Sequence, residues 1–162
     1  MRVGELIRGI FERRPTERSA TTRDRPSRVG TPAAALCGAT PDGAPTEMAL
    51  DGPPVALLFL TSSCYGCQVL WEGIATSVRP VGDPTVHPSI VVVTPSASTE
   101  SARRIAALAS GAVEVVMSSD SWHAYDVTKA PWYVMVAGGL VVADGPAPST
   151  WDRVETLVGR GR

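Results

Sequence analysis

Two runs of apolar residues without polar alternation predict strands that are buried on both faces of a sheet. These runs span residues 55–60 and 90–93, and a third strand is expected over residues 113–117. Apolar residues at helical spacing lie between these runs, over residues 69–78 and 100–109. The pattern therefore predicts that strands and helices alternate through the middle of the chain, which is the arrangement of an α/β fold.

Two further pairs of runs predict β-hairpins, because each pair flanks a turn-rich segment. Residues 33–37 are expected to pair with residues 47–50, ahead of the first buried strand. Near the end of the chain, residues 132–136 and 140–142 face each other across Gly138-Gly139. The second hairpin would add two antiparallel strands to the sheet.

The helix boundaries follow from residues that cap helices or stop them. Ser98 or Thr99 is expected to cap the helix at 100–109, and a last amphipathic helix is expected over residues 151–158. The complete order of elements predicts a central mixed β-sheet flanked by helices, with an N-terminal hairpin extension.

The N-terminal part has a different pattern from the rest. Residues 3–11 carry apolar positions at helical spacing, and residues 13–31 consist mainly of Arg, Thr, Ser and Pro. We expect a short amphipathic helix and a flexible basic linker over residues 1–31, followed by one domain over residues 32–162. A helix that docks on the domain or frays in solution is favoured over membrane contact, because its apolar face is only about three turns long.

Composition and charge narrow the class of protein. The chain has 162 residues, an apolar fraction of 44% and a formal net charge of −1, which fits one globular domain and favours no nucleic-acid partner. Residues 1–30 hold eight Arg and four acids, a balance of +4 that leaves −5 for the rest. Neither a signal-peptide run nor a transmembrane run is visible, so a cytoplasmic location is expected.

The most informative chemistry lies at the end of the first buried run. Thr61-Ser62-Ser63 forms a polar turn that leads to Cys64 and Cys67, where a helix is expected to begin. The unpaired N–H groups and the dipole of a helix N-terminus stabilise a thiolate, which is the nucleophilic form of cysteine. Cys64 is therefore expected to be exposed and reactive, with Cys67 close enough to form a disulfide with it.

A strand followed by C-x-x-C at a helix start is typical of a thioredoxin-like redox site. Together with Tyr125–Pro131 and Gly138-Gly139, the segment Phe59–Cys67 makes the chain from about Pro32 resemble the thioredoxin-like superfamily. Within it, the chain is similar to the redoxin branch of TlpA-type and methylamine-dehydrogenase-accessory-type thiol-disulfide proteins.

The resemblance implies a thiol-disulfide oxidoreductase that acts through a mixed disulfide with a protein substrate and needs a separate redox partner. It places Cys64 and Cys67 at the catalytic centre and makes the Ala130-Pro131 bond the family's cis-proline, opposite the cysteines. Ala130, Pro131 and Trp132 would then line the substrate groove. The redox-active disulfide is expected to be sufficient without a cofactor. Members of this branch tend to be exported or membrane-tethered.

The chain also departs from the family pattern. The strand at 55–60 lacks the buried acid that serves many members as a proton acceptor, and the nearest acid, Glu72, is expected to be solvated. Two alternatives therefore stay open. One is a binding module in which the Cys64-Cys67 bond is structural. The other is a thiol peroxidase, because Thr61 stands three residues before Cys64.

Three other residues were considered as ligands or reactive groups. Cys37 lies in a predicted hairpin strand, where a buried free thiol that packs as a small apolar residue is expected. His87 and His123 have no metal-ligand spacing to another ligand, so no metal site is expected.

Overall fold

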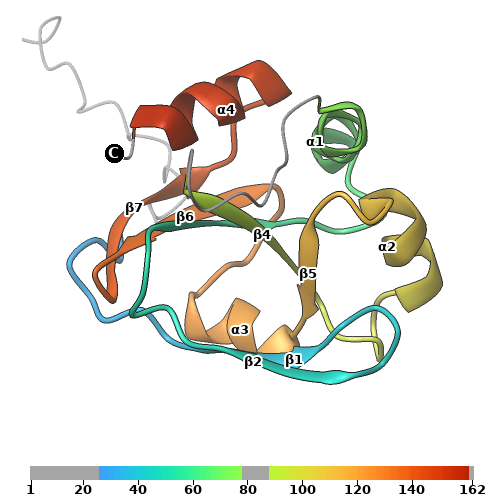
Figure 1. Cartoon of the computed structure of the whole chain (residues 1–162), viewed down its shortest axis with the longest axis horizontal. Helices are drawn as coiled ribbons and strands as arrows, with labels where there is room; N and C mark the ends of the chain where they lie inside the picture. Colours follow the sequence, from blue (N-terminus) through green and yellow to red (C-terminus); the bar gives the residue numbers. More distant parts are fainter. Residues whose placement is uncertain (1–25, 78–87, 161–162) are drawn as a thin grey trace, which may run out of the picture.

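The computed structural model describes residues 26–77 and 88–160, and its centre is a mixed β-sheet (Figure 1). The strands are β1 (Leu36–Ala39), β2 (Pro45–Met48), β3 (Val55–Phe59), β4 (Ser89–Thr94), β5 (Glu114–Met117), β6 (Trp132–Ala137) and β7 (Leu140–Pro146). They form one seven-stranded sheet in the order β2-β1-β5-β4-β3-β6-β7. β3, β4 and β5 run parallel, and the other neighbours pair antiparallel. The predicted mixed α/β sheet is confirmed.

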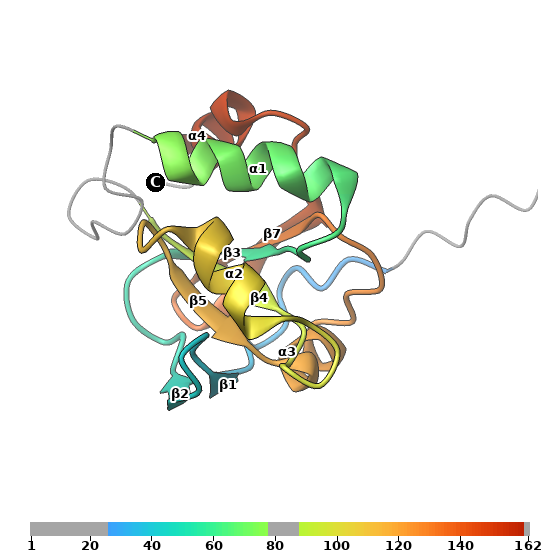
Figure 2. The ribbon, with the colours of Figure 1, turned by 90° about the vertical axis from the view of Figure 1, so that its right-hand side faces the viewer.

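Helices cover both faces of this sheet. They are α1 (Tyr65–Thr76), α2 (Ala102–Ala109), α3 (Ser119–Ala124) and α4 (Trp151–Arg160). Figure 2 shows α1 and α4 above the sheet and α3 below it. Buried residues of α1, α2 and α4 form one core cluster, and residues around α3 form the other. Successive β3 residues point to opposite faces, and all are buried because each face is covered.

Strand β3 occupies the middle of the sheet and delivers the chain to α1. It pairs in parallel with β4 and antiparallel with β6, so that Phe59 lies between Val93 and Trp132. α1 then packs closely on α4 at Gly73, where an added Cβ atom would lie 2.4 Å from the Cβ of Trp151. The site at the end of β3 is therefore supported by covered strands on both sides.

The predicted first hairpin forms. β1 pairs with β2 so that Cys37 lies opposite Glu47, and the turn closes through a hydrogen bond of 2.9 Å from Thr40 N–H to the Ala44 carbonyl. The paired segments, residues 36–39 and 45–48, lie closer to the turn than the predicted segments 33–37 and 47–50. The Thr40–Ala44 turn fixes the register, because hairpin pairing follows from the turn that closes it.

The segment before β1 runs along the outer edge of β7. The Gly30 N–H donates to the Val141 carbonyl at 2.8 Å, and the Val141 N–H donates to the Thr31 carbonyl at 2.9 Å. Asp144 accepts hydrogen bonds from the Ser27 hydroxyl and the Arg28 N–H. This segment therefore covers an edge that would otherwise present unpaired backbone groups.

The expected helix at residues 3–11, the linker up to residue 25 and the loop with His87 lie outside the described residues. Within residues 26–77 and 88–160, no helix has the length and apolar character needed to cross a membrane.

The start of α2 is the largest correction to the predicted helices. Ser101, rather than Ser98 or Thr99, caps this helix, because its hydroxyl accepts the Arg104 N–H at 3.3 Å. Glu100 therefore precedes the helix instead of forming its first residue. This places the Glu100 carboxylate in the loop between β4 and α2.

Candidate active site

Cys64 is the N-cap residue of α1, as the sequence predicted, and its side chain is half-buried. Its sulfur accepts the Cys67 N–H at 3.3 Å, and its carbonyl accepts the Gln68 N–H at 3.2 Å. The sulfur thus takes the place of a capping oxygen, where a backbone N–H and the positive end of the helix dipole favour negative charge. This placement favours Cys64 as a nucleophile.

Cys67 lies one turn into the same helix and is fully buried. Burial, followed by its hydrogen bond with Cys64, raises the pKa of the Cys67 thiol to about 12. Its sulfur lies 3.5 Å from the Thr61 N–H, which works in the opposite direction. At neutral pH Cys67 is therefore a neutral thiol behind the more accessible Cys64.

Thr61 joins the end of β3 to both cysteines. Its hydroxyl accepts the Cys64 N–H at 3.2 Å, and its own N–H points at the Cys67 sulfur. Its carbonyl accepts the indole N–H of Trp71 at 3.1 Å. The Thr61 hydroxyl is therefore occupied with a backbone group of the turn.

The turn contains one contact that the sequence did not indicate. Glu100, from the loop between β4 and α2, accepts hydrogen bonds from both the N–H and the hydroxyl of Ser62. Ser62 is buried, and its carbonyl accepts the Gln68 side-chain amide at 2.9 Å. Glu100 is 38 positions from Ser62, and the only sequence signal for it is an acid immediately before a helix cap.

The Ala130-Pro131 bond is cis, as the resemblance implied, and it lies against the cysteine turn. The Cys64 thiol donates to the Ala130 carbonyl at 3.5 Å. A Cβ atom added to Gly66 would lie 3.2 Å from Pro131 Cδ, so that the residues between the cysteines leave little space in front of the proline. Residues 64–67 and 130–131 therefore form one site.

Trp132 begins β6 directly after this proline. It is half-buried, pairs opposite Phe59 and packs against the core cluster on the α3 side of the sheet. Its expected part in a substrate groove remains a prediction.

The prediction that Cys37 is buried is wrong, because this residue is exposed. Its neighbour Leu36 is fully buried, and successive residues of a strand point to opposite faces. Leu36 therefore takes the inward position of β1 and leaves the Cys37 thiol in solvent. The Cys37 carbonyl accepts the Ser118 hydroxyl at 2.5 Å, which ties β1 to the start of α3.

Two other residues with ionisable side chains are exposed. Glu72 is exposed on α1, as expected, and His123 is exposed at the end of α3. Among the residues that the structure describes, no group of three His, Cys, Asp or Glu is arranged to hold a metal ion.

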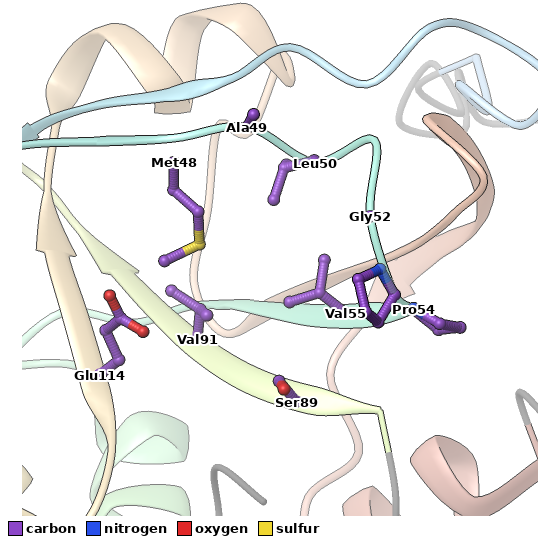
Figure 3. Close-up of a pocket in the computed structure, with 10 residues that line it drawn as sticks. Met48, Ala49, Leu50, Gly52, Pro54, Val55, Ser89, Val91 and Glu114 are labelled. Atoms are coloured by element: carbon purple, nitrogen blue, oxygen red, sulfur yellow. The ribbon is translucent and has the colours of Figure 1, made fainter. Parts of the chain in front are cut away.

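A pocket of about 250 Å³ lies at the end of the sheet opposite to the cysteine pair (Figure 3). Met48, the last residue of β2, and Leu50 form one side of the pocket, and the β3 and β4 residues Val55 and Val91 form the other. Val55 is the first residue of β3, whereas Cys64 follows the last. The pocket is therefore separate from the cysteine site.

Comparisons with known proteins place the fold. No family model matches the sequence, and no curated protein matches it either. Solved structures do match. The structure is similar to a secreted Mycobacterium tuberculosis disulfide oxidoreductase homologous to E. coli DsbE, with a TM-score of 0.61, 20% identity, and coverage of 77% of this chain and 95% of the other.

Two further solved structures have the same kind of fold. The exposed lipoprotein thioredoxin Etrx1 of Streptococcus pneumoniae has a TM-score of 0.60 and 17% identity over 78% of this chain and 99% of its own. A putative thiol:disulfide interchange protein DsbE of Chlorobium tepidum has a TM-score of 0.62 and 19% identity over 79% of this chain and 93% of its own. The chain therefore has a thioredoxin-like fold.

Proposed function

We propose that this protein is a thiol-disulfide oxidoreductase that uses Cys64 and Cys67 as its redox pair. The observation that carries the proposal is the asymmetry of the two sulfurs. Cys64 is partly accessible at the N-cap of α1, whereas Cys67 is fully buried and protonated behind it. One sulfur is thus placed for attack and the other for resolution. The disulfide oxidoreductases among proteins of similar structure support this assignment.

The reaction begins when the Cys64 thiolate attacks one sulfur of a substrate disulfide. A Cys64–substrate bond forms, the substrate S–S bond breaks, and the second substrate sulfur leaves as a thiolate. Cys67 then loses its proton, and its sulfur attacks the Cys64 sulfur. The Cys64–Cys67 bond forms and the Cys64–substrate bond breaks. The two substrate thiolates take up the proton released by Cys67 and one from solvent, so the substrate leaves as a dithiol, reduced by two electrons. A partner dithiol returns the pair to its reduced form, and the reverse sequence oxidises a substrate.

Formation of the mixed disulfide itself prepares Cys67 for the second step. Burial is the largest cause of the raised pKa of the Cys67 thiol, and the hydrogen bond between the two side chains and a negative Cys64 sulfur raise it further. The two contributions from Cys64 are lost when Cys64 becomes part of a disulfide. The pKa of Cys67 then falls from its value of about 12 in the reduced pair, and deprotonation becomes easier at the moment when resolution requires it.

The substrate chain would be held beside the cis-proline. The Ala130 carbonyl is 3.5 Å from the Cys64 sulfur, so a substrate bonded to Cys64 passes directly over Ala130 and Pro131. An extended chain in this position can form strand-like hydrogen bonds with Ala130, while Trp132 lies next along β6. A protein disulfide fits this site better than a compact reagent, because only an extended chain reaches these groups.

Trapping on insulin, a soluble protein with disulfides, tests the proposed roles. Each variant carries Cys37→Ser, because the exposed Cys37 would otherwise react. A variant that also carries Cys67→Ser should accumulate a covalent adduct with insulin on non-reducing gels, since nothing resolves it. A variant with Cys64→Ser should form little adduct. Equal amounts of adduct from the two variants would show that the nucleophile is assigned wrongly.

A further inference from the structure

We infer that Glu100 is a positioning residue for the redox pair, and that it acts through Ser62; this inference rests on the proposed function. Ser62 is only 4% exposed, and all three of its polar groups are held by side chains. Its N–H donates to one Glu100 carboxylate oxygen at 3.1 Å, and its hydroxyl donates to the other. Its carbonyl accepts the Gln68 amide at 2.9 Å.

These contacts fix two successive peptide groups of the turn. The Ser62 N–H and the Thr61 carbonyl belong to one planar peptide unit. Glu100 holds the N–H of this unit, and the indole of Trp71 holds its carbonyl at 3.1 Å. Gln68 holds the carbonyl of the next unit. Neither unit can rotate without breaking a hydrogen bond to a side chain from another part of the fold.

The orientation of these units sets the surroundings of both sulfurs. Thr61 provides the hydroxyl that accepts the Cys64 N–H at 3.2 Å and the N–H that lies 3.5 Å from the Cys67 sulfur. A rotation of the Thr61–Ser62 unit would displace Thr61 and change both contacts. Glu100 is therefore connected to the cysteines through Thr61, although it lies on the far side of the turn.

The carboxylate is well suited to this task. It accepts two hydrogen bonds from one buried residue, and a third from the Ser101 N–H at 3.3 Å. Removal of the acceptor would leave two buried donors unpaired. Within the described part of the chain, Ser62 and Ser101 are the hydrogen-bond donors to the Glu100 carboxylate. The role of Glu100 is therefore to position the turn rather than to contact the reacting sulfurs.

Glu100→Gln and Glu100→Asp separate a positioning role from a charge effect. Glutamine has the same length as glutamate: its carbonyl oxygen can accept the Ser62 N–H, and its amide can donate to the Ser62 hydroxyl. Aspartate keeps the charge but is one methylene shorter, so it cannot reach both donors. Positioning thus predicts that the glutamine variant behaves as the parent and that the aspartate variant is impaired.

Two quantities are measured. The first is the equilibrium constant for the formation of the Cys64–Cys67 disulfide by oxidised glutathione. The second is the rate at which Cys67 resolves a glutathione adduct on Cys64. All variants carry Cys37→Ser. We expect Glu100→Asp to lower both quantities about tenfold, because one of the two buried Ser62 donors is left unpaired. Glu100→Gln should stay within about twofold of the parent. The matched control is Glu72→Asp, a change at an exposed glutamate of α1 that should leave both quantities unchanged.

The inference is overturned if Glu100→Asp matches the parent, or if Glu100→Gln is the impaired variant, since the charge would then be what matters. These outcomes leave the proposed function intact as long as the parent exchanges with glutathione. A parent that does not exchange removes both the proposed function and this inference. If Glu100→Asp does not fold, Ser62→Ala tests the same connection from the other side, because it removes one of the two donors. A Ser62→Ala variant with the parent's equilibrium and resolution rate would then overturn the inference.

Discussion

The buried thiol of Cys67 should be almost unreactive in the native reduced protein. A pKa of about 12 leaves a fraction of about 10⁻⁵ as thiolate at pH 7, whereas an ordinary thiol with a pKa near 8.5 has about 3%. Since only the thiolate is alkylated, Cys67 should react about 10³ times more slowly than an exposed cysteine, before its lack of access is considered. The exposed Cys37 provides that reference within the same molecule.

The assay is alkylation by iodoacetamide at pH 7, followed by mass spectrometry of the peptides that contain each cysteine. Alkylation of Cys64 would change the surroundings of Cys67, so the rate is also measured in Cys64→Ser. Burial is the largest cause of the raised pKa of Cys67, and it persists in this variant, so Cys67 should remain slow. In guanidinium chloride all cysteines should react at similar rates. Reaction of native Cys67 within tenfold of Cys37 would refute the assigned burial and the division of roles.

Three further predictions concern stability, pH and the substrate. Gly73→Ala would place a methyl group 2.4 Å from the Trp151 Cβ. It should lower the free energy of unfolding, measured by urea denaturation, by about 1–3 kcal/mol. Gly159→Ala, at a position with open space, should not lower the free energy of unfolding. Folding raises the pKa of Cys67, so the stability that this thiol contributes to the reduced protein is present below about pH 9 and is lost as the pH rises toward 12. The free energy of unfolding of the reduced protein should therefore fall more steeply between about pH 8.5 and 10.5 than that of Cys67→Ala. Parallel curves for the two proteins would contradict this prediction. Tyr65 is 90% exposed beside the nucleophile, so Tyr65→Ala should slow exchange with insulin more than exchange with glutathione and leave the urea midpoint unchanged. Equal slowing of both exchanges would argue against a protein substrate contact there.

Local patterns were sufficient to predict the frame of the site. The apolar run before Thr61 predicted a strand covered on both faces, and the polar turn after it predicted a helix start near Cys64; both are confirmed. The position of Pro131 came from the family resemblance rather than from any local signal. Short stretches of sequence specify these features, so they can be predicted without knowledge of how the elements pack.

Features that depend on packing or on exact register were not predictable. The exposure of Cys37 was not predicted, because it depends on which residue of β1 points inward. The contact between Glu100 and Ser62 joins segments 38 positions apart, and Glu100 belongs to no motif that the sequence shows. Only the parallel pairing of β3 with β4 brings the two loops that carry them to the same end of the sheet.

The redox equilibrium of Cys64 and Cys67 with glutathione tests the central claim most directly. The equilibrium is measured in Cys37→Ser over a range of ratios of reduced to oxidised glutathione. Each sample is quenched with acid and alkylated, and the oxidised and reduced forms of the protein are quantified by mass spectrometry. A redox centre should exchange reversibly, with a potential between about −270 and −120 mV, the range of thioredoxin-type oxidoreductases. A disulfide that stays intact in reduced glutathione, with a potential below about −300 mV, would instead be structural and would contradict the proposed function.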